Sequence, residues 1–370
     1  MTPVHRAFWE GRRVLVTGHT GFKGSWLATW LRRLGAEVTG YSLPAPTVPA
    51  MYEAVRVADG IRSTEGDVRD FEQVSACMAK YQPEVVIHLA AQAWVKAGYA
   101  DPLTTYTTNV TGTLHVLEAV RRTPSVRVTV AITSDKCYEN QEWIWGYREN
   151  DRMGGHDPYS SSKGCAELLI SAYRDSYFPP ERIAEHGVAL ASTRAGNVIG
   201  GGDWSADRLV PDIMRAIMDR KSVEIRRPGA VRPWQFVLEP LRGYLELAER
   251  LWTDGEAFAG GWNFGPDTEQ IQPVRWIVER LSRQWGEGAS WALDESTHPH
   301  EDHFLRLDCT KAKALLGWRP VLDLETTLDW IVEWYRAYLR GDDVRALTEM
   351  QIERYESLCA ASREKEGKAE

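Results

Sequence analysis

Cysteine is scarce in this sequence, and its five copies show no pattern that would link them. Cys77, Cys137, Cys165, Cys309 and Cys359 are widely spaced, with no C-x-x-C pair among them. A disulfide-braced exported domain is therefore not expected, whereas free thiols suit a reducing cytoplasm. The stretch HPHEDH at 298–303 is the nearest approach to a metal motif, but its spacing matches no standard site. We predict no bound metal.

Long apolar runs and an excess of positive charge are also missing. Nowhere do 18 apolar residues follow one another, and the first 16 residues contain no signal-like hydrophobic stretch. The formal net charge of −8 disfavours nucleic acid as a partner. We therefore expect a soluble cytoplasmic protein that has neither a membrane nor a nucleic-acid partner.

The sequence does contain a regular alternation of strand-like and helix-like segments. Helical patterns cover 101–122, where Asp101 is the expected N-cap before Pro102, and 159–177, which ends before a Pro-Pro pair. Alternation of this kind predicts an α/β fold with a parallel sheet covered by helices. The expected strands lie at 12–18, 36–42, 61–67, 83–91 and 126–134, with a sixth starting at 188.

The length of the chain and a change in pattern predict a second, smaller domain. Residues 1–195 are expected to form the domain with the parallel sheet, and a later segment near 230–250 returns to it. Residues 196–355 mainly form a smaller α/β domain at the carboxyl ends of the strands, where a substrate would bind. Residues 356–370 are expected to be a polar tail.

Three glycines mark the turn between the first strand and the next helix. Gly18, Gly21 and Gly24 form a G-x-x-G-x-x-G pattern, in which small residues let a pyrophosphate approach backbone N–H groups and the positive end of a helix. In this setting we predict a Rossmann-type dinucleotide site rather than a merely structural turn. The second strand ends at Tyr41-Ser42, with no acid for the adenosine ribose and no arginine for a 2′-phosphate. NAD is therefore favoured over NADP.

A second motif, YSSSK, places Tyr159 and Lys163 on one face of a helix. A nearby ammonium group favours the tyrosinate form of Tyr159, which makes this residue a plausible base for a sugar hydroxyl. The motif alone is common on surface helices. Together with the glycine turn, and with Ser134 at the end of the fifth strand, it predicts a Ser–Tyr–Lys catalytic set.

The stretch TSDKCYEN at 133–140 places an acid, Asp135, beside a base, Lys136. In isolation such a pair is usually a solvated turn. At the end of the strand that carries Ser134, it could instead supply both an acid and a base to one reaction.

Seven stretches resemble the extended short-chain dehydrogenase/reductase superfamily and, within it, the CDP-glucose 4,6-dehydratases. They occur in the family's order between about residue 10 and about residue 340. The resemblance implies an NAD-binding Rossmann domain with a small C-terminal domain for the nucleotide sugar, and a homodimer formed through helices at 101–121 and 159–178. The stretches are TGHTGFKGSWL, HLAAQ, TSDKCYEN, DPYSSSKGCAEL, RAGNVIGGGDW, RPWQFVLEPL and KALLGWRP.

The resemblance also implies a reaction, the loss of water across C5 and C6 of CDP-D-glucose. Tyr159 takes the proton of the C4 hydroxyl while hydride passes from C4 to NAD. Lys136 removes the C5 proton, and Asp135 protonates the departing C6 hydroxyl. Hydride then returns to C6, which regenerates the tightly bound NAD and gives CDP-4-keto-6-deoxy-D-glucose for deoxysugar and lipopolysaccharide synthesis. The related dTDP-glucose enzymes carry adjacent Asp and Glu at this place.

By the same resemblance, further positions are expected to contact the cofactor or the substrate. Two departures from the family pattern bear on the substrate side: Phe236 stands where a histidine is expected, and Asp302 is a second, weaker departure. The expected cofactor residues are Gly18, Thr20, Gly21, Phe22, Lys23, Gly24, Asp67, Val68, Leu89, Ala90, Ala91, Gln92, Asn109, Thr133, Tyr159, Lys163 and Arg194, and the expected substrate residues are Asn197, Arg208, Leu209, Arg232, Trp234, Asn263 and Glu301.

Three other functions remain open at this stage. A nucleotide-sugar 4-epimerase needs the Ser–Tyr–Lys set but has no use for Asp135 and Lys136. A 4,6-dehydratase of another nucleotide sugar, such as a heptose, would share every catalytic group. A non-catalytic NAD-binding regulator commonly loses the catalytic Tyr or Lys, and this chain has both.

Overall fold

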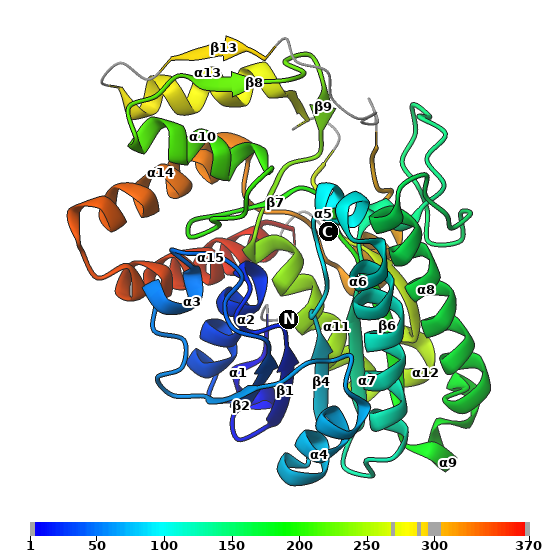
Figure 1. Ribbon diagram of the computed structural model, residues 1–370. Coiled ribbons are helices and arrows are strands. Elements are labelled where there is room, and N and C mark those ends of the chain that lie inside the picture. Colours follow the sequence, from blue (N-terminus) through cyan, green and yellow to red (C-terminus); the bar gives the residue numbers. More distant parts are fainter. Residues whose placement is uncertain (1–3, 268–270, 287–289, 295–304, 367–370) are drawn as a thin grey trace.

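A seven-stranded parallel sheet forms the middle of the protein (Figure 1). The computed structural model describes residues 4–267, 271–286, 290–294 and 305–366. The strand order is β11-β6-β5-β4-β1-β2-β3, and every neighbouring pair is parallel. The strands are β1 (Arg13–Thr17), β2 (Glu37–Ser42), β3 (Arg62–Glu65), β4 (Val85–His88), β5 (Val128–Ile132), β6 (Ala189–Arg194) and β11 (Gly260–Asn263).

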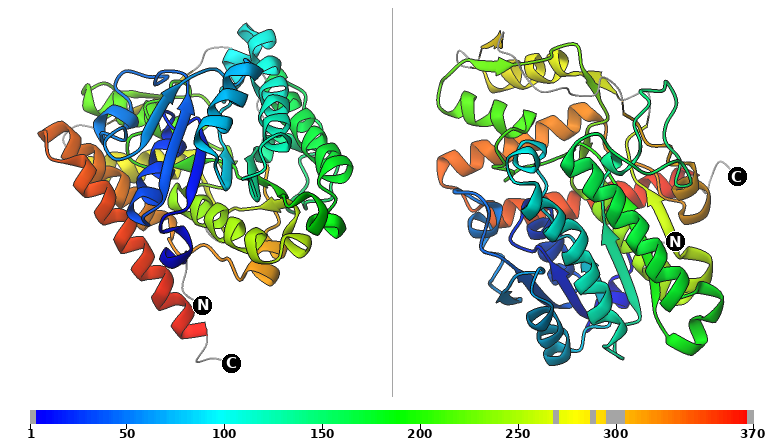
Figure 2. Two further views of the ribbon diagram at one scale, coloured as in Figure 1. Left: turned by 90° about the horizontal axis from the view of Figure 1, so that it is seen from below. Right: turned by 45° about the vertical axis from the view of Figure 1, so that its right-hand side comes forward.

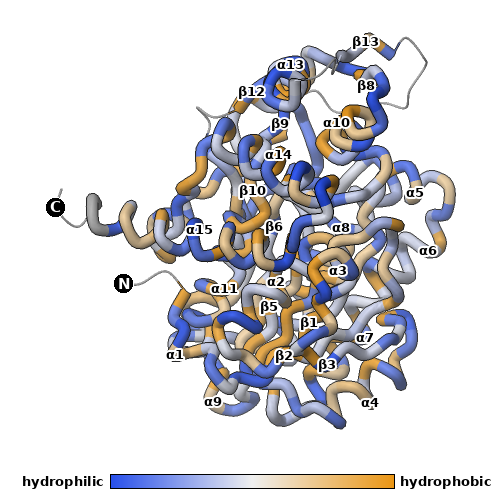
Figure 3. The backbone as a smooth tube through the Cα atoms, turned by 90° about the vertical axis from the view of Figure 1, so that its left-hand side faces the viewer, coloured by the Kyte–Doolittle hydropathy of each residue, from blue (hydrophilic) through white to orange (hydrophobic). Residues whose placement is uncertain are grey.

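Both faces of this sheet are buried. Successive side chains of a strand point to opposite faces, so Val14 and Val16 of β1 belong to one hydrophobic cluster and Leu15 to another. The central strands are accordingly mostly apolar, and β5 is buried along its whole length (Figure 3). This pattern is typical of parallel sheets, whose crossover helices cover both sides.

Helices cover the two faces in separate groups. The cluster that contains Leu15 also holds residues of α4 (Phe71–Tyr81), α7 (Gly112–Arg121) and α8 (Pro158–Tyr177). The cluster on the other face holds residues of α2 (Phe22–Arg33) and α11 (Leu238–Thr253). The expected α/β fold, a doubly wound Rossmann-type sheet, is confirmed.

The sheet is completed by a strand that comes much later in the chain. Strand β11 pairs with β6, and α11, which precedes it, packs against β5 and β6. The sequence analysis predicted six strands and missed β11, because its residues, Gly-Gly-Trp-Asn, carry little β-branched or alternating signal.

A smaller α/β part lies beyond the carboxyl ends of the strands, at the top of Figure 1. Its helices pack through a shared apolar layer, since α13 contacts both α10 and α14. It consists of α10 (Leu209–Met218), α13 (Val274–Trp285), α14 (Leu324–Arg340) and three two-stranded sheets, β7 (Val198–Ile199) with β10 (Gln235–Phe236), β8 (Val223–Ile225) with β13 (Trp291–Leu293), and β9 (Val231–Arg232) with β12 (Gln272–Pro273).

Short elements connect these layers. The single helix expected at 101–122 is divided, because a π-helical turn separates α6 from α7. Its predicted N-cap is confirmed, since the Asp101 side chain accepts a hydrogen bond from the Thr104 N–H. The connecting elements are α1 (Arg6–Trp9), α3 (Met51–Ala54), α5 (Val95–Ala100), α6 (Pro102–Tyr106), α9 (Ile183–His186), α12 (Gly255–Phe258), the 3₁₀ turns Asp135–Cys137 and Pro180–Arg182, and the π turns Thr107–Thr111 and Ala312–Leu316.

The C-terminal segment is a long helix, which corrects the expected polar tail at 356–370. Helix α15 (Val344–Glu366) runs across the protein next to α2 and α14, as Figures 1 and 2 show. Cys359 is buried on its inner face, and the Arg363 guanidinium donates to the Glu246 carboxylate at 2.6 Å. Polar composition hid these contacts, since only one side of the helix is covered.

Candidate active site

A cavity of about 740 Å³ lies between the carboxyl edge of the sheet and the smaller part. In parallel α/β sheets this edge is where ligands bind. Most of the positions expected from the sequence line this cavity: Gly18, Thr20, Gly21, Phe22, Lys23, Gly24, Asp67, Val68, Leu89, Ala90, Ala91, Gln92, Thr133, Ser134, Asp135, Lys136, Tyr159, Lys163, Asn197, Arg208, Leu209, Arg232 and Trp234.

The glycine turn joins β1 to α2 at one end of the cavity. Gly18 has φ +76°, and a Cβ atom there would lie 2.7 Å from the backbone nitrogen of Ala90. A side chain at Gly24 would collide with the Gly18 carbonyl. Both positions therefore require glycine for the fold itself. Gly21 differs, because its φ is −76° and a Cβ would meet only the Gly18 oxygen at 3.4 Å.

The end of β2 carries no acidic side chain, as expected. Ser42 hydrogen bonds with the Thr20 hydroxyl at 2.8 Å, which fastens this strand end to the glycine turn. An acid does follow β3, where Asp67 accepts a hydrogen bond from the Arg69 backbone at 2.9 Å. The Arg69 side chain also hydrogen bonds to this carboxylate and lowers the pKa of Asp67, so it is negatively charged at the edge of the cavity.

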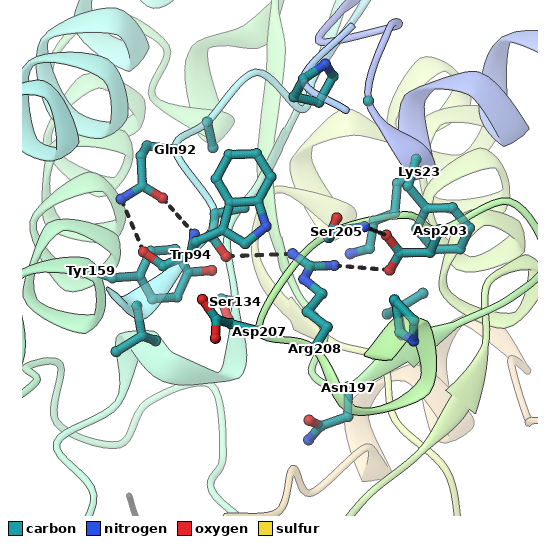
Figure 4. Close-up of a pocket in the computed structure, with 18 of the residues that line it drawn as sticks. Lys23, Gln92, Trp94, Ser134, Tyr159, Asn197, Asp203, Ser205, Asp207 and Arg208 are labelled. Atoms are coloured by element: carbon teal, nitrogen blue, oxygen red, sulfur yellow. Dashed lines mark hydrogen bonds and ion pairs between the residues drawn. The ribbon is translucent and has the colours of Figure 1, made fainter. Parts of the chain in front are cut away.

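The Ser–Tyr–Lys set meets on one wall of the cavity. Ser134 is the second residue after β5, and Tyr159 and Lys163 lie on the first turns of α8, which the Asp157 side chain caps at the Ser160 N–H. Ser134 lies close enough to Tyr159 to oppose the rise that burial causes in the pKa of the phenol, and all three side chains are buried. Figure 4 shows Ser134 and Tyr159 side by side.

Burial and neighbouring charges shift the pKa values of the ionisable groups in this wall. Burial raises the pKa of Tyr159, while the Ser134 hydrogen bond and the Arg208 charge lower it. Burial lowers the pKa of Lys163 to about 8, although the Glu167 carboxylate opposes this change. Burial also lowers the pKa of Lys23 to about 7, helped by the charges of Arg208 and Lys163. Arg208 therefore supplies positive charge near the phenol, whereas burial makes both lysines easier to deprotonate.

Asp135 and Lys136 lie in the 3₁₀ turn that follows Ser134. The Ser134 hydroxyl donates to Asp135 Oδ1 at 2.9 Å and accepts from the Lys136 N–H at 3.2 Å. On its other side the Asp135 carboxyl packs against Gly196, where any side chain would collide with it. Lys136 is half-buried, and both residues line the cavity. The pair is therefore part of the site and not a solvated turn.

Arg208 crosses the cavity on the opposite side. Its guanidinium lies 3.5 Å from the buried Asp203 carboxylate and donates to the Ala93 carbonyl at 3.4 Å, as Figure 4 shows. This arginine thereby connects the loop after β4 to the loop before α10. Planar guanidinium groups suit phosphate oxygens, so this side of the cavity suits a diphosphate.

Three expected site residues do not line the cavity. Asn109 lies in the π turn and holds the loop after β4, because its amide exchanges hydrogen bonds with the Gln92 backbone at 2.9 and 3.0 Å. Arg194 pairs with Glu167 behind the catalytic wall. Asn263 is fully buried and accepts from the Tyr138 hydroxyl at 2.8 Å. Their side chains support the walls of the site.

Other positions lie outside the site or outside the described residues. Phe236 is fully buried and packs edge-on against Trp26 and Trp330, so this departure from the family pattern does not reach the cavity. Glu301, Asp302 and the whole HPHEDH stretch fall outside the described residues. Within the part of the chain that the structure describes, no cluster of three or more His, Cys, Asp or Glu side chains could hold a metal ion.

The sequence analysis also missed several residues of the cavity wall. Trp94 projects into the cavity above Arg208 in Figure 4, and its backbone is held by the Gln92 side chain. The only signal for it was its place two residues after HLAAQ. Arg226 and Arg227 form an adjacent basic pair that could have been noted. Asp203 and Asp207 follow the glycine-rich loop at 200–202 and look like ordinary loop residues.

Gly21 is the position at which the dinucleotide prediction can be tested without disturbing the fold. Gly21→Val adds a side chain where only one neighbouring atom lies within 4 Å, so the variant should fold, but the bulk blocks the approach of a pyrophosphate to the start of α2. We expect NAD binding, measured by calorimetry, to fall below detection. Normal affinity in the folded variant would show that the turn does not hold a pyrophosphate.

Comparisons with known proteins agree with this site. Residues 15–186 match the model of the family described as GDP-mannose 4,6 dehydratase. The UDP-glucose 4-epimerase of Thermus thermophilus, solved in complex with NAD, is 25% identical to this chain with a TM-score of 0.74 over 88% of this chain and 99% of the other. The dTDP-glucose 4,6-dehydratase of Streptomyces griseus is 28% identical over 88% of this chain and 94% of that protein.

A curated relative is much more similar. The CDP-glucose 4,6-dehydratase of Salmonella typhimurium is 54% identical over 354 residues, which cover 96% of this chain and 99% of the relative. Coverage at this level leaves no large segment of either chain unmatched. The chain therefore belongs to the CDP-glucose 4,6-dehydratase family.

Proposed function

We propose that this protein is an NAD-dependent hydro-lyase that converts CDP-D-glucose into CDP-4-keto-6-deoxy-D-glucose. One observation carries the proposal: Asp135 and Lys136 follow Ser134 directly and line the same cavity as Tyr159 and Lys163. Oxidation of a sugar and elimination from it need these two sets of groups together. The similarity to the Salmonella enzyme supports cytidine as the base.

The residues of the cavity fit NAD. The glycine turn has open space at Gly21 in front of the α2 N-terminus, and the charged Asp67 suits a hydroxyl or amino donor of the adenosine half. When bound, NAD supplies the acceptor for the C4 hydride and the hydride that returns to C6. Gly18, Gly21 and Lys23 would hold its pyrophosphate, and Tyr159 and Lys163 would lie beside its nicotinamide ribose.

In the first half of the reaction, Tyr159 acts as the base for the C4 hydroxyl. Ser134 has a single hydroxyl hydrogen, which is donated to Asp135 in the structure and would turn to the sugar oxygen when substrate binds. The ammonium group of Lys163 favours the tyrosinate. The positive charge of Arg208 acts in the same direction. The Ser134 hydroxyl also contacts Asp135, so the two catalytic sets share one hydrogen-bonded residue.

In the second half, the C4 ketone acidifies the proton at C5. Lys136 accepts this proton, and Asp135 delivers a proton to the C6 hydroxyl as it leaves as water. A 4-epimerase only removes and returns the C4 hydride, so it has no use for this acid–base pair. The Asp135–Lys136 pair therefore favours dehydration over epimerisation on the same fold.

We also propose a homodimer in the cytoplasm and a place in deoxysugar synthesis for lipopolysaccharide. Large apolar side chains are exposed on neighbouring helices, with Leu103 on α6 and Leu168 and Tyr177 on α8. Helices α6 and α7 with α8 would form the interface. None of the described helices has the length and apolarity that a membrane span requires. Equilibrium sedimentation should give twice the chain mass, and a monomer would contradict this interface.

Tyr159→Phe tests the first half of the reaction. The variant lacks the group that takes the C4 hydroxyl proton, so the formation of reduced nicotinamide on mixing with CDP-glucose should fall by about 10²–10⁴-fold. Stopped-flow absorbance measures this step. Tyr173→Phe, on the same helix but outside the cavity, is the control and should react normally. A rapid reaction in Tyr159→Phe would remove Tyr159 from this role.

Lys136→Met tests the second half. Methionine keeps the length of the side chain but cannot accept a proton, so turnover should fall by about 10²–10⁴-fold while the oxidised sugar and reduced nicotinamide accumulate. Exchange of the C5 hydrogen with heavy water should also be lost. Lys80→Met, at an exposed position on α4, is the matched control. Normal C5 exchange in Lys136→Met would show that another group is the base.

A further inference from the structure

A buried ion pair lies behind the catalytic wall, and no step of the proposed reaction uses it. Glu167 belongs to α8, one turn after Lys163, and Arg194 ends β6. Their side chains are only 4% and 5% exposed, and Arg194 Nη2 lies 2.8 Å from Glu167 Oε2. Buried charges destabilise a protein unless they are paired and hydrogen-bonded. The hydrogen-bond partners of this pair therefore indicate its role.

Glu167 binds the strand that leads into the catalytic turn. Its Oε1 accepts a short hydrogen bond from the Thr133 hydroxyl, and its Oε2 accepts from Ser192 at 2.8 Å. Thr133 immediately precedes Ser134. The carboxylate thereby fixes the start of the segment that carries Ser134, Asp135 and Lys136.

Arg194 binds the other end of the same segment. Its Nη1 donates to the Tyr138 hydroxyl at 2.6 Å and to the Glu149 carbonyl at 2.9 Å. The Tyr138 hydroxyl in turn donates to Asn263 Oδ1 at 2.8 Å, and the Tyr138 ring stacks on Tyr147. One ion pair thus holds both ends of residues 133–138.

Within this segment the hydrogen bonds of the turn itself are few. The Cys137 N–H donates to the Ser134 carbonyl at 3.1 Å, and the Tyr138 N–H donates to the Asp135 carbonyl at 3.4 Å, which is long. A three-residue 3₁₀ turn is weak by itself. Its geometry must therefore come from its anchors.

We propose that the Glu167–Arg194 pair is a clamp that positions Asp135 and Lys136 for the elimination step. The clamp comprises Glu167, Arg194 and the two hydroxyl groups that they hold, Thr133 Oγ1 and Tyr138 OH. This inference rests on the proposed function, because it assigns positioning residues to the dehydration. Glu167, Arg194 and Tyr138 do not line the cavity.

The two halves of the reaction depend on the clamp to different degrees. Tyr159 and Lys163 are placed by α8 itself, whose start is capped by Asp157. The turn with Asp135 and Lys136 lies outside any long helix or strand, and its supports include Ser134, Gly196, the hydrogen bond from the Gly154 N–H to the Cys137 carbonyl at 2.8 Å, and the clamp. A misplacement of about 1 Å can cost about 10²-fold in rate. Loosening the clamp should therefore slow elimination more than oxidation.

The charged residues are poor targets for a test. Glu167→Gln would leave Arg194 buried without its counter-ion, so unfolding could hide any effect on catalysis. Glu167 also raises the pKa of Lys163, so its removal would disturb the oxidation step. Tyr138 is the better target, because its hydroxyl is a neutral member of the clamp and its ring is held by Tyr147.

Tyr138→Phe keeps the ring and removes the contacts of the hydroxyl with Arg194 and Asn263. We expect the C5 hydrogen exchange in heavy water to fall about tenfold, which corresponds to the loss of one charge-assisted hydrogen bond, while the formation of reduced nicotinamide changes less than about threefold. A second readout needs neither cofactor nor substrate. Amide hydrogen exchange of a peptide spanning 133–140 should become faster, with the melting temperature close to that of the wild type.

Matched variants separate the clamp from general damage to the loop. Tyr147→Phe removes a hydroxyl from the same aromatic stack, where it contacts Asn140 and Gln141 instead of Arg194, and should keep the wild-type ratio of exchange to oxidation. At the start of the segment, Thr133→Val removes the hydroxyl that donates to Glu167 and should lower the ratio of C5 exchange to oxidation. Thr133→Ser keeps a hydroxyl and should have a ratio near that of the wild type.

Two results in Tyr138→Phe would overturn the clamp. The first is a ratio of C5 exchange to nicotinamide reduction, and an amide protection of 133–140, that both equal those of the wild type. The second is an equal loss of both half-reactions together with a lowered melting temperature. The proposed function fails in a different way. In that case the wild-type protein neither forms reduced nicotinamide nor exchanges C5 with CDP-glucose.

Discussion

Many of the groups that meet in the cavity follow the carboxyl end of a strand, and the common direction of the strands is the constraint on which the site depends. Because all seven strands of the sheet run parallel, the turns after β1, β3, β4, β5 and β6 open on the same edge. The glycine turn, Asp67, the Gln92 loop, the Ser134 turn and Asn197 come together in this way. Helix α8 then adds Tyr159 and Lys163 from the side. Reversal of any one strand would remove its group from the cavity.

The balance of charge at this edge of the sheet explains how so many ionisable groups can lie in and around one cavity. Lys23, Lys163 and Arg208 make the cavity positive, which suits diphosphate groups and a tyrosinate. Behind the wall, the negative charge of the Glu167 carboxylate offsets part of this positive charge. The Arg194 guanidinium donates a hydrogen bond to Oε2 of the same carboxylate. Glu167 therefore acts from behind the wall, while the carboxyl groups of Asp67, Asp135, Asp203 and Asp207 line the cavity together with the positive groups.

Local patterns predicted most strands of the central sheet, the glycine turn and the Tyr–Lys pair, whereas the family resemblance supplied most other expected site positions. A spacing of four puts Tyr159 and Lys163 on one helix face, and the glycines mark the strand-to-helix turn wherever the rest of the chain goes. Arg194 could not be placed in this way. It shares a strand face with Ser192, and that face meets α8, whose Glu167 is distant in sequence. Its position at a strand end looked like a ligand contact, but a long-range partner decided its role. Strand β11 and the π turn at 107–111 were missed for a similar reason, since neighbours and not local propensity determine them.

The late arrival of β11 affects how the chain can fold as it is synthesised. Until residues 260–263 have left the ribosome, β6 is the outer strand, with its N–H and C=O groups unpaired along one side. Helix α11, which covers one face of β5 and β6, is also still missing. Exposed strand edges and uncovered apolar faces favour association with other chains. A fragment that stops near residue 195 would keep both defects permanently, even though it contains the glycine turn and the whole Ser–Tyr–Lys set. Residues 1–195 thus contain the glycine turn and the Ser–Tyr–Lys set in one stretch of chain. The sheet that carries them is complete only when α11 and β11 are added.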